Sequence, residues 1–268
     1  MSRTRHFIHI KGSNLLYGRV PKVANSSIKS VLCRLLEQKP VRSIKTTSDR
    51  FWRECTHEQT ELLTANQARK LRHSHYSFSF VRNPFDRLIA AYNNKVIEID
   101  DPPLPMRRMG IVHNMPFDDF LGVLARASLE DYDVHLMPQH HILQSGERLV
   151  PKFIGRMEQM NDHWKILRKR MLRRGVRLAK ALPEKNVRRS GGRSLTPYFN
   201  NARLIDQFLE IYGQDVKLFY SDVSIDTLIA NASIPTIRPL KPSDANSDNE
   251  NIHKANIHNA NSHDALNP

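Results

Sequence analysis

The chain has 268 residues, 40% of them hydrophobic, which is enough to bury the core of one large α/β domain, although two small domains remain an alternative. Its 41 Lys and Arg against 27 Asp and Glu give a formal net charge of +14, which favours an anionic partner: nucleic acid, a phosphorylated or sulfated nucleotide, an acidic polysaccharide or an anionic membrane surface. No stretch approaches the ~20 apolar residues of a membrane-spanning helix, and two cysteines, Cys33 and Cys55, are too few for a disulfide framework.

The N-terminal segment bears on the location of the protein. Residues Met1–Ile10 include basic residues but no apolar run of signal-peptide length. Together with the low cysteine content, this predicts a cytoplasmic protein. The alternative is the Golgi lumen, which would require an N-terminal anchor that has been removed.

The first organised unit is a strand, a polar turn and a helix. We expect a short edge strand at His6–Ile10, a buried strand at Leu15–Val20 and a helix at Ser26–Glu37 with apolar residues at helical spacing. The turn carries Lys22 and two serines at the start of the helix. Because a helix N-terminus has unpaired N–H groups and a partial positive charge, this turn is a candidate anion site. It lacks the Gly-x-x-x-x-Gly-Lys-Ser/Thr spacing of ordinary nucleotide triphosphatases.

A second unit of the same kind follows the aromatic, alternating strand Tyr76–Val81. Arg82 ends this strand, Asn83 can cap a helix, and Pro84 suits the first helical position. The expected helix has an apolar face formed by Phe85, Leu88, Ile89, Tyr92 and Val96. Two strand–turn–helix units predict a parallel sheet with its site at the strand ends.

The other segments are assigned more coarsely. A helix from about His57 to Leu71 would begin at a capping box formed by Thr56 and Gln59. Further expected elements are a substrate-side loop or lid at 100–116, a helix at 117–127, a strand at 151–157, a very basic helix at 161–174, a basic loop at 183–195 and a helix at 200–212 followed by 216–220.

The composition changes near residue 235, where large apolar side chains almost disappear. We therefore expect one α/β domain over residues 1–232 and a disordered tail over 233–268. A degenerate five-residue repeat in the tail contains His253, His258 and His263. Metal binding by these histidines is conceivable, but a repeat expansion without function is the favoured interpretation.

Two stretches together resemble a known family: Pro21-Lys22-Val23-Ala24-Asn25-Ser26-Ser27 after a strand, and Phe80-Val81-Arg82-Asn83-Pro84-Phe85-Asp86-Arg87-Leu88-Ile89-Ala90-Ala91-Tyr92 from a strand into a helix. They are similar to the two nucleotide-binding signatures of carbohydrate sulfotransferases that use 3′-phosphoadenosine 5′-phosphosulfate, and most of all to the chondroitin, dermatan and HNK-1 group with its bacterial relatives. Weaker similarities follow in order at Asp133–His135 with Gln139, at Phe153–Glu158, at Asn186–Arg193 and at Tyr212–Tyr220.

The resemblance implies a single P-loop-like domain with a central, mostly parallel sheet flanked by helices. It implies donor binding by Lys22, Val23, Ala24, Asn25, Ser26 and Ser27, by Arg82 at the 3′-phosphate, and by Ser190 and Arg193 in a loop that closes over the nucleotide. Burial of Arg82 at a strand end without an anion would be costly, which also favours the phosphate role. One departure is Ala90, where the family has a serine that joins the arginine at the 3′-phosphate. Another is the absence of the usual glycine between Phe219 and Tyr220.

The resemblance also implies a mechanism. Lys22 would neutralise charge on the bridging oxygen as the nucleotide leaves. Histidine suits the role of base for the acceptor hydroxyl because of its pKa. His135 is the first choice, since it lies in the histidine segment of the family, and His75 is the second. No metal is expected.

Several alternatives stay open. A P-loop-like kinase is disfavoured by the missing lysine spacing, and nucleic-acid binding by the lack of aromatic residues in the basic run 165–177. A degenerate, non-catalytic relative is a further reading because of Ala90. The expected partner is a carbohydrate acceptor, as a polysaccharide or glycolipid, with no nucleic acid and no transmembrane segment; peripheral contact with a membrane is compatible with the basic helix.

Overall fold

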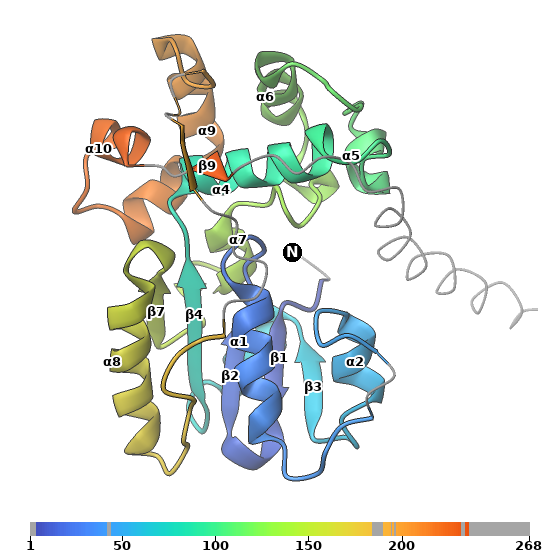
Figure 1. Cartoon of the computed structure of the whole chain (residues 1–268), viewed down its shortest axis with the longest axis vertical. Helices are drawn as coiled ribbons and strands as arrows, with labels where there is room; N and C mark the ends of the chain where they lie inside the picture. Colours follow the sequence, from blue (N-terminus) through green and yellow to red (C-terminus); the bar gives the residue numbers. More distant parts are fainter. Residues whose placement is uncertain are drawn as a thin grey trace, which may run out of the picture.

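Five strands form one mixed sheet in the lower half of the molecule as drawn in Figure 1. The computed structural model describes residues 4–41, 44–183, 190–193, 195, 197–231 and 234–235. The strand order is β3-β1-β2-β4-β7, with bounds Phe7–Ile10 (β1), Leu15–Gly18 (β2), Thr60–Leu63 (β3), Tyr76–Val81 (β4) and Phe153–Arg156 (β7). Strands β2, β4 and β7 are parallel, and β1 pairs antiparallel with both β2 and β3. The carboxyl ends of the three parallel strands therefore share one edge of the sheet.

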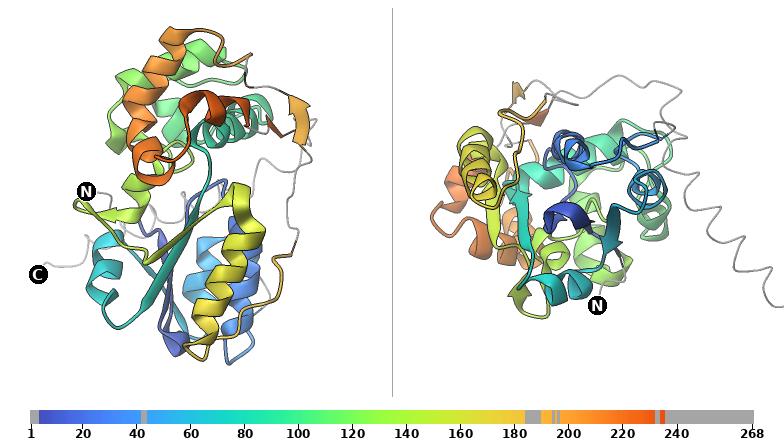
Figure 2. Two further views of the ribbon diagram at one scale, coloured as in Figure 1. Left: turned by 90° about the vertical axis from the view of Figure 1, so that its left-hand side faces the viewer. Right: turned by 90° about the horizontal axis from the view of Figure 1, so that it is seen from below.

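The strands are apolar because both faces of the sheet are covered. Every residue of β1, β2 and β4 is buried, which is the pattern of strands with helices on both sides. Helices α1 (Asn25–Leu32) and α8 (Met160–Leu172) cover one face. Helix α3 (Ala65–Leu71) and the hairpin of β5 (Gln144–Ser145) and β6 (Arg148–Leu149) cover the other, as both views in Figure 2 show.

A layer of helices lies beyond the carboxyl ends of the parallel strands, and the arrow of β4 in Figure 1 points into it. Its members are α4 (Pro84–Tyr92), α5 (Leu104–Arg108), α6 (Phe117–Arg126), α9 (Ala202–Phe219) and α10 (Ile225–Ala230). Phe85 of α4 stacks on Phe208 of α9 with ring centroids 3.9 Å apart, and Phe199 lies edge-on to both. This aromatic packing fixes α4 against α9 and so fixes what α4 presents to the sheet.

Four further short elements belong to the described part of the chain. Helix α2 (Asp49–Glu54) packs on β3, and α7 (Gln139–Leu143) lies between the sheet and the helical layer. Strands β8 (Ser190–Arg193) and β9 (Ile234–Pro235) pair with each other, and β9 contacts α4. Across the described ranges, none of the helices combines the length and apolar character needed to cross a membrane.

The predicted class, an α/β domain with a mostly parallel central sheet flanked by helices, is confirmed. The second strand–turn–helix unit is also as expected: Asn83 accepts a hydrogen bond from the N–H of Phe85, and Pro84 opens α4. The predicted tail, residues 233–268, lies outside the described residues apart from β9.

The prediction of one helix from His57 to Leu71 is wrong. Residues Thr60–Leu63 form the edge strand β3, and the capping box belongs to Thr64 and Gln67 at the start of α3. Because β3 pairs outside β1, the first strand is an interior strand and not the predicted edge. The hydroxyl of Thr56 instead hydrogen-bonds that of Thr60, 2.8 Å away.

The C-terminal helix is longer than predicted. Helix α9 continues through Tyr212 without a break and ends at Phe219. Its buried residues recur at helical spacing along the whole length, at Leu204, Phe208, Tyr212, Asp215 and Phe219. The single glycine in this stretch, Gly213, is not enough to end a helix that is packed along one face.

Candidate functional site

The loop between β2 and α1 has an unusual backbone. Lys22 and Ala24 adopt left-handed conformations, with φ of 67° and 47°, which non-glycine residues rarely do. Such strain costs on the order of 1–3 kcal/mol at each position and concentrates at functional sites. Ala24 is also the N-cap of α1, so no side chain at that position accepts a hydrogen bond from the first turn of the helix.

The carbonyl groups of this loop are held from behind by side chains. The carbonyl of Val20 accepts from the Asn25 amide at 2.9 Å, that of Pro21 from Arg87 Nε at 3.1 Å, and that of Lys22 from Arg82 Nη1 at 3.3 Å. Both arginines come from the second strand–turn–helix unit. The two units identified in the sequence are thus joined directly, and the loop keeps its shape through contacts within the protein.

The side chains of the loop do not all face outward. The Val23 side chain is buried, and the Asn25 side chain is used internally, because its Oδ1 accepts from the Tyr17 hydroxyl and its amide holds Val20. Ser27 is buried and Ser26 is half-buried in the first turn of α1. Among the residues predicted to bind the donor, Val23 and Asn25 can therefore contribute only backbone groups in this arrangement.

Lys22 lies beside the end of α4. Its Nζ donates a hydrogen bond to Asn94 Oδ1, and the Asn94 amide donates to Glu98 Oε2 at 3.1 Å. Asn94 belongs to a π-helical turn, Asn93–Ile97, that continues α4. π-Helical turns occur frequently at functional sites because they redirect side chains out of the regular helix.

Arg82 is paired within the protein. Its Nε donates to Asp86 Oδ2 at 2.8 Å, so the anion expected from its burial is already supplied by a residue one helical turn ahead. Only 8% of Arg82 is exposed. Among the described residues its Nη2 has no hydrogen-bond partner, which leaves donors of the guanidinium for a bound anion.

Arg87 connects the loop to the histidine segment. It is 2% exposed, and besides Pro21 it donates to the carbonyls of Met137, at 2.9 Å, and Val134, at 3.4 Å. A lysine has one ammonium group and could not span three carbonyls in this way. Arg87 is therefore a positioning residue that fixes His135 relative to Lys22.

His135 forms a pair with Asp133. The carboxylate accepts from His135 Nδ1 at 2.7 Å and from the backbone N–H of His135 at 2.8 Å. Burial raises the pKa of Asp133, but the hydrogen bonds from His135, aided by the positive charge of Lys95, outweigh it and hold that pKa below its usual value. Because the carboxylate is ionised, Nδ1 carries the proton and Nε2 is left as the basic nitrogen.

The surroundings of His135 keep it neutral. Burial lowers its pKa from the ordinary 6.5; Asp133 opposes this, while the positive charges of Lys95 and Lys22 add to it. The hydrogen bonds of Arg87 to the carbonyls of Pro21, Val134 and Met137 bring together the segments that carry Lys22 and His135. With 27% of its side chain exposed, His135 remains accessible to a second reactant.

Helix α9 holds the histidine segment in place. Tyr212 donates to the Leu136 carbonyl at 2.6 Å, and Asp215 accepts from the backbone N–H groups of Gln139 and His140 at 2.7 and 2.8 Å. Gln139 in turn bonds both the N–H and the carbonyl of Arg82, at 3.0 and 2.8 Å. Tyr212 and Asp215, which belong to the C-terminal part of the resemblance, thus hold the backbone of the histidine segment in place.

Not every predicted residue is brought to this edge. His75 precedes Tyr76 at the amino end of β4, bonds Ser74 Oγ and lies with its ring against that of His9, so its assignment as second-choice base is corrected. Ser190 and Arg193 lie on β8, and most of the loop before them, 184–189, lies outside the described residues. Their contact with a nucleotide stays a prediction.

Three polar residues of the site were not predicted from the sequence: Asn94, Lys95 and Glu98. Lys95 and Glu98 are buried; Asn94 and Lys95 lie in the π-helical turn that continues α4, and Glu98 is its C-cap. The available signal in the sequence was the polar run Asn93-Asn94-Lys95, directly after the apolar residues of α4. In the ranges that the structure describes, no three His, Cys, Asp or Glu side chains form a group that could hold a metal ion.

Comparison with known proteins gives one match. The model of the sulfotransferase family matches residues 5–221, which include both strand–turn–helix units, the histidine segment and all of α9. No curated protein and no solved structure matches the chain significantly.

Proposed function

Since the chain belongs to the sulfotransferase family, we propose that it transfers a sulfuryl group from 3′-phosphoadenosine 5′-phosphosulfate to a hydroxyl of a carbohydrate acceptor. One observation carries the proposal. The Lys22 loop, Arg82 and the His135–Asp133 pair meet at the carboxyl ends of β2 and β4, joined by the hydrogen bonds of Arg82 and Arg87.

The residues present fit the donor. The start of α1 has no capping side chain at Ala24, and its N–H groups and dipole favour an anion such as the 5′-phosphosulfate. Arg82, on the neighbouring strand, has a guanidinium nitrogen for the 3′-phosphate. When bound, the donor supplies an electrophilic sulfuryl group, and the protein contributes charge and orientation, as in phosphoryl transfer.

Lys22 and His135 have complementary roles in the proposed reaction. The Lys22 ammonium, steadied by Asn94, neutralises negative charge on the departing phosphate. His135 Nε2 accepts the proton of the acceptor hydroxyl, and the Asp133 carboxylate stabilises the imidazolium that results. His135 suits this role at neutral pH because its pKa lies below 6.5.

The carbohydrate acceptor is supported by the resemblance of the two motifs and by the charge of the chain. A net charge of +14 favours an acceptor that is itself acidic, such as a carboxylated or already sulfated glycan.

The non-catalytic alternative rests on Ala90, which lies buried in α4 one helical turn beyond Asp86.

Calorimetry with the product nucleotide, 3′-phosphoadenosine 5′-phosphate, tests the donor part of the proposal. Wild-type protein should bind it, and Arg82→Ala should weaken binding by at least ~1.5 kcal/mol, the contribution of a charged hydrogen bond. The matched control is Arg126→Ala, an exposed arginine at the end of α6. Absence of binding by the wild-type protein would overturn the proposal.

A further inference from the structure

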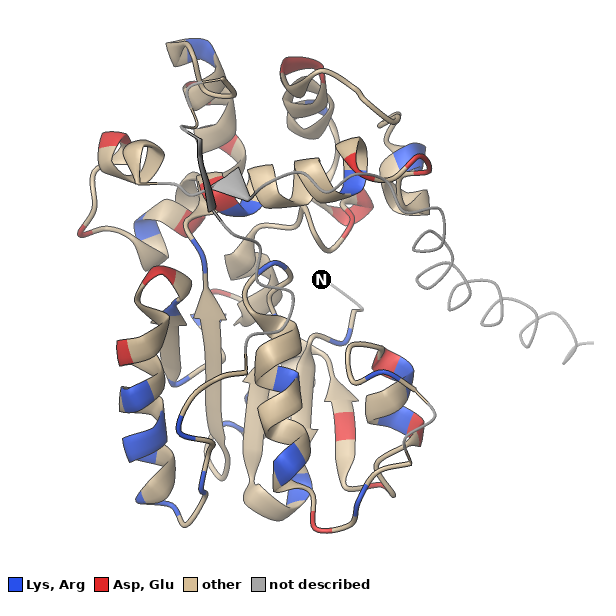
Figure 3. Cartoon of the chain, in the orientation of Figure 1, with Lys and Arg blue, Asp and Glu red and all other residues tan. Residues whose placement is uncertain are grey.

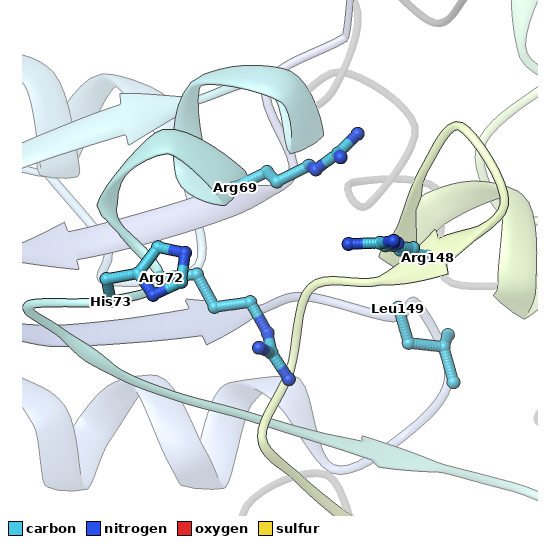
Figure 4. A pocket seen from close by; sticks show the side chains of 5 residues that line it. All are labelled: Arg69, Arg72, His73, Arg148 and Leu149. Atoms are coloured by element: carbon cyan, nitrogen blue, oxygen red, sulfur yellow. The ribbon is translucent and has the colours of Figure 1, made fainter.

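A second cationic site lies between the end of α3 and the β5–β6 hairpin. It is a depression with a cavity volume of about 380 Å³, lined by Arg69, Arg72, His73, Arg148 and Leu149 (Figure 4). Figure 4 shows Arg69 and Arg72 extending from the α3 side and Arg148 extending toward them from the hairpin. Segments about 75 residues apart in the chain thus present three guanidinium groups to one space.

Two of these arginines are anchored through only part of their donors. Arg69 Nη1 donates to the Ser145 carbonyl and Arg72 Nε to the Val150 carbonyl, each at 3.2 Å. The Arg148 side chain donates to no described residue. Since a guanidinium carries five N–H donors, most of the donors in the depression have no protein acceptor in the described chain.

Among the residues that the structure describes, no carboxylate forms an ion pair with Arg69, Arg72 or Arg148. Glu147 lies next to Arg148 in the hairpin turn and is exposed, yet it pairs with none of the three. Three arginines without a counter-charge around one depression favour an anion from outside the protein.

The positive charge continues from the depression toward α8. Lys152 lies between: its Nζ donates to the carbonyl of His75 at 2.9 Å, next to Tyr76 at the amino end of β4. The Arg174 guanidinium lies 4.4 Å from the centre of the Tyr76 ring, and that of Arg170 lies 5.1 Å from the Phe153 ring. The basic face of α8 is visible in Figure 3. Together the depression and these residues form a basic row across the amino ends of β4 and β7.

We propose that this basic row, centred on Arg69, Arg72 and Arg148, binds the carboxylate or sulfate groups of an acidic oligosaccharide. Guanidinium groups bind such planar or tripodal oxyanions with paired hydrogen bonds. A single-stranded nucleic acid would need exposed aromatic faces for its bases. The neighbouring rings of Tyr76 and Phe153 are buried and lie under arginines.

The row lies at the opposite end of β4 from Arg82, roughly 20 Å away along the chain for the six residue steps from Tyr76 at about 3.3 Å each. The basic row therefore binds a part of a long acceptor chain other than the sugar unit that carries the reacting hydroxyl. The choice of a glycan as the ligand rests on the proposed function, whereas the anion site itself does not.

The test measures binding of a fluorescent heparin octasaccharide at a fixed moderate salt concentration. The triple variant Arg69→Ser/Arg72→Ser/Arg148→Ser should raise the Kd at least tenfold and flatten its dependence on salt. The control Arg108→Ser/Arg126→Ser/Arg203→Ser removes the same charge from exposed positions of the helical layer and should change the Kd by less than twofold. Equal losses in the two triple variants would overturn the proposal.

Three further arms separate the remaining outcomes. Arg148→Ser alone removes no described hydrogen bond and should still raise the Kd severalfold, so a folding defect cannot account for the result; an unchanged Kd contradicts the site. An unlabelled single-stranded DNA of equal charge should compete at least tenfold more weakly than unlabelled octasaccharide. Equal competition would indicate that the ligand of this site is a nucleic acid and not a glycan. Binding of 3′-phosphoadenosine 5′-phosphate should be unchanged in the triple variant, which separates failure here from failure of the proposed function.

Discussion

The two ends of the central sheet use positive charge in different ways. At the carboxyl ends of β2 and β4, the cations have partners within the protein: Lys22 bonds Asn94, Arg82 bonds Asp86, and Arg87 bonds three carbonyls. At the amino end of β4, Arg69, Arg72 and Arg148 have no carboxylate partner within the described part of the chain. Hydrogen-bonded partners hold the cations at the carboxyl ends of the strands in the fixed geometry that a reaction requires. Positive charge without such partners, as on the arginines of the depression, attracts an anionic ligand without prescribing one orientation.

Among the variants that test this comparison, loss of Lys22 should have the largest effect on activity. Lys22→Ala should lower kcat by about 10²–10³-fold, the usual cost of removing a group that stabilises developing charge. The measurement is transfer of radiolabelled sulfate to a panel of desulfated chondroitin, dermatan and heparan chains. The control is Lys11→Ala, an exposed lysine just after β1. If both variants keep full activity, charge at the carboxyl edge is not part of the chemistry.

The His135–Asp133 pair comes next. His135→Gln should lower kcat by about 10²-fold, the lower end for a lost general base. In the wild type, the rate should fall as pH drops below 6.5, because the lowered pKa of His135 means that its base form is lost only in acid. Asp133→Asn removes the carboxylate that raises the pKa of His135, so the acidic limb should move to lower pH. A limb that stays in place after this substitution would assign the titration to another group.

The role of Arg87 as a connection between the two halves of the site can be tested by Arg87→Lys. Two or more buried carbonyls would lose their donor, so the free energy of unfolding should fall by roughly 2–3 kcal/mol in urea titrations. A lost connection should also lower kcat more than it weakens binding of the product nucleotide. Arg126→Lys, at an exposed position, is the control for both measurements. Proportionate changes in kcat and binding would leave Arg87 with a purely structural role.

Ala90→Ser should have the smallest effect. The hydroxyl would lie one helical turn beyond Asp86, on the side of α4 where Arg82 lies. One added hydrogen bond to the 3′-phosphate should strengthen binding of the product nucleotide by about 1 kcal/mol, or roughly fivefold. Calorimetry with the desphospho analogue, which lacks the 3′-phosphate, is the control, since its affinity should not change. Equal gains for both nucleotides would place the hydroxyl elsewhere.

What the sequence predicts well is local. Strand β4, its Asn83–Pro84 helix start and the adjacency of the Lys22 and Arg82 turns follow from apolar runs, capping residues and the geometry of parallel strands. Residues Thr60–Leu63 form a strand where the local pattern predicts a helix, because these four residues gain their stability from pairing with β1, which no local pattern records.

The partners of the charged groups were beyond local patterns. The Asp86 partner of Arg82 is four residues away and could have been inferred from helical spacing. The contacts of Arg87 with Val134 and Met137, and of Asp215 with α7, join segments about 50 and 75 residues apart. The arginine-lined depression likewise exists only once α3 and the hairpin meet on one face of the sheet.

The π-helical turn at Asn93–Ile97 has a consequence for how this chain is aligned with others. Each residue of a helix turns the following side chains by about 100° around its axis, so one residue more or less after α4 would exchange the partner of Lys22. An alignment that shifts this segment by a single position would match Asn94 with the place of Asn93, whose Oδ1 accepts from the Tyr198 hydroxyl, or with that of Lys95. The reliable anchor for comparing relatives here is therefore the Lys22–Asn94 contact and not the count of residues from Arg82.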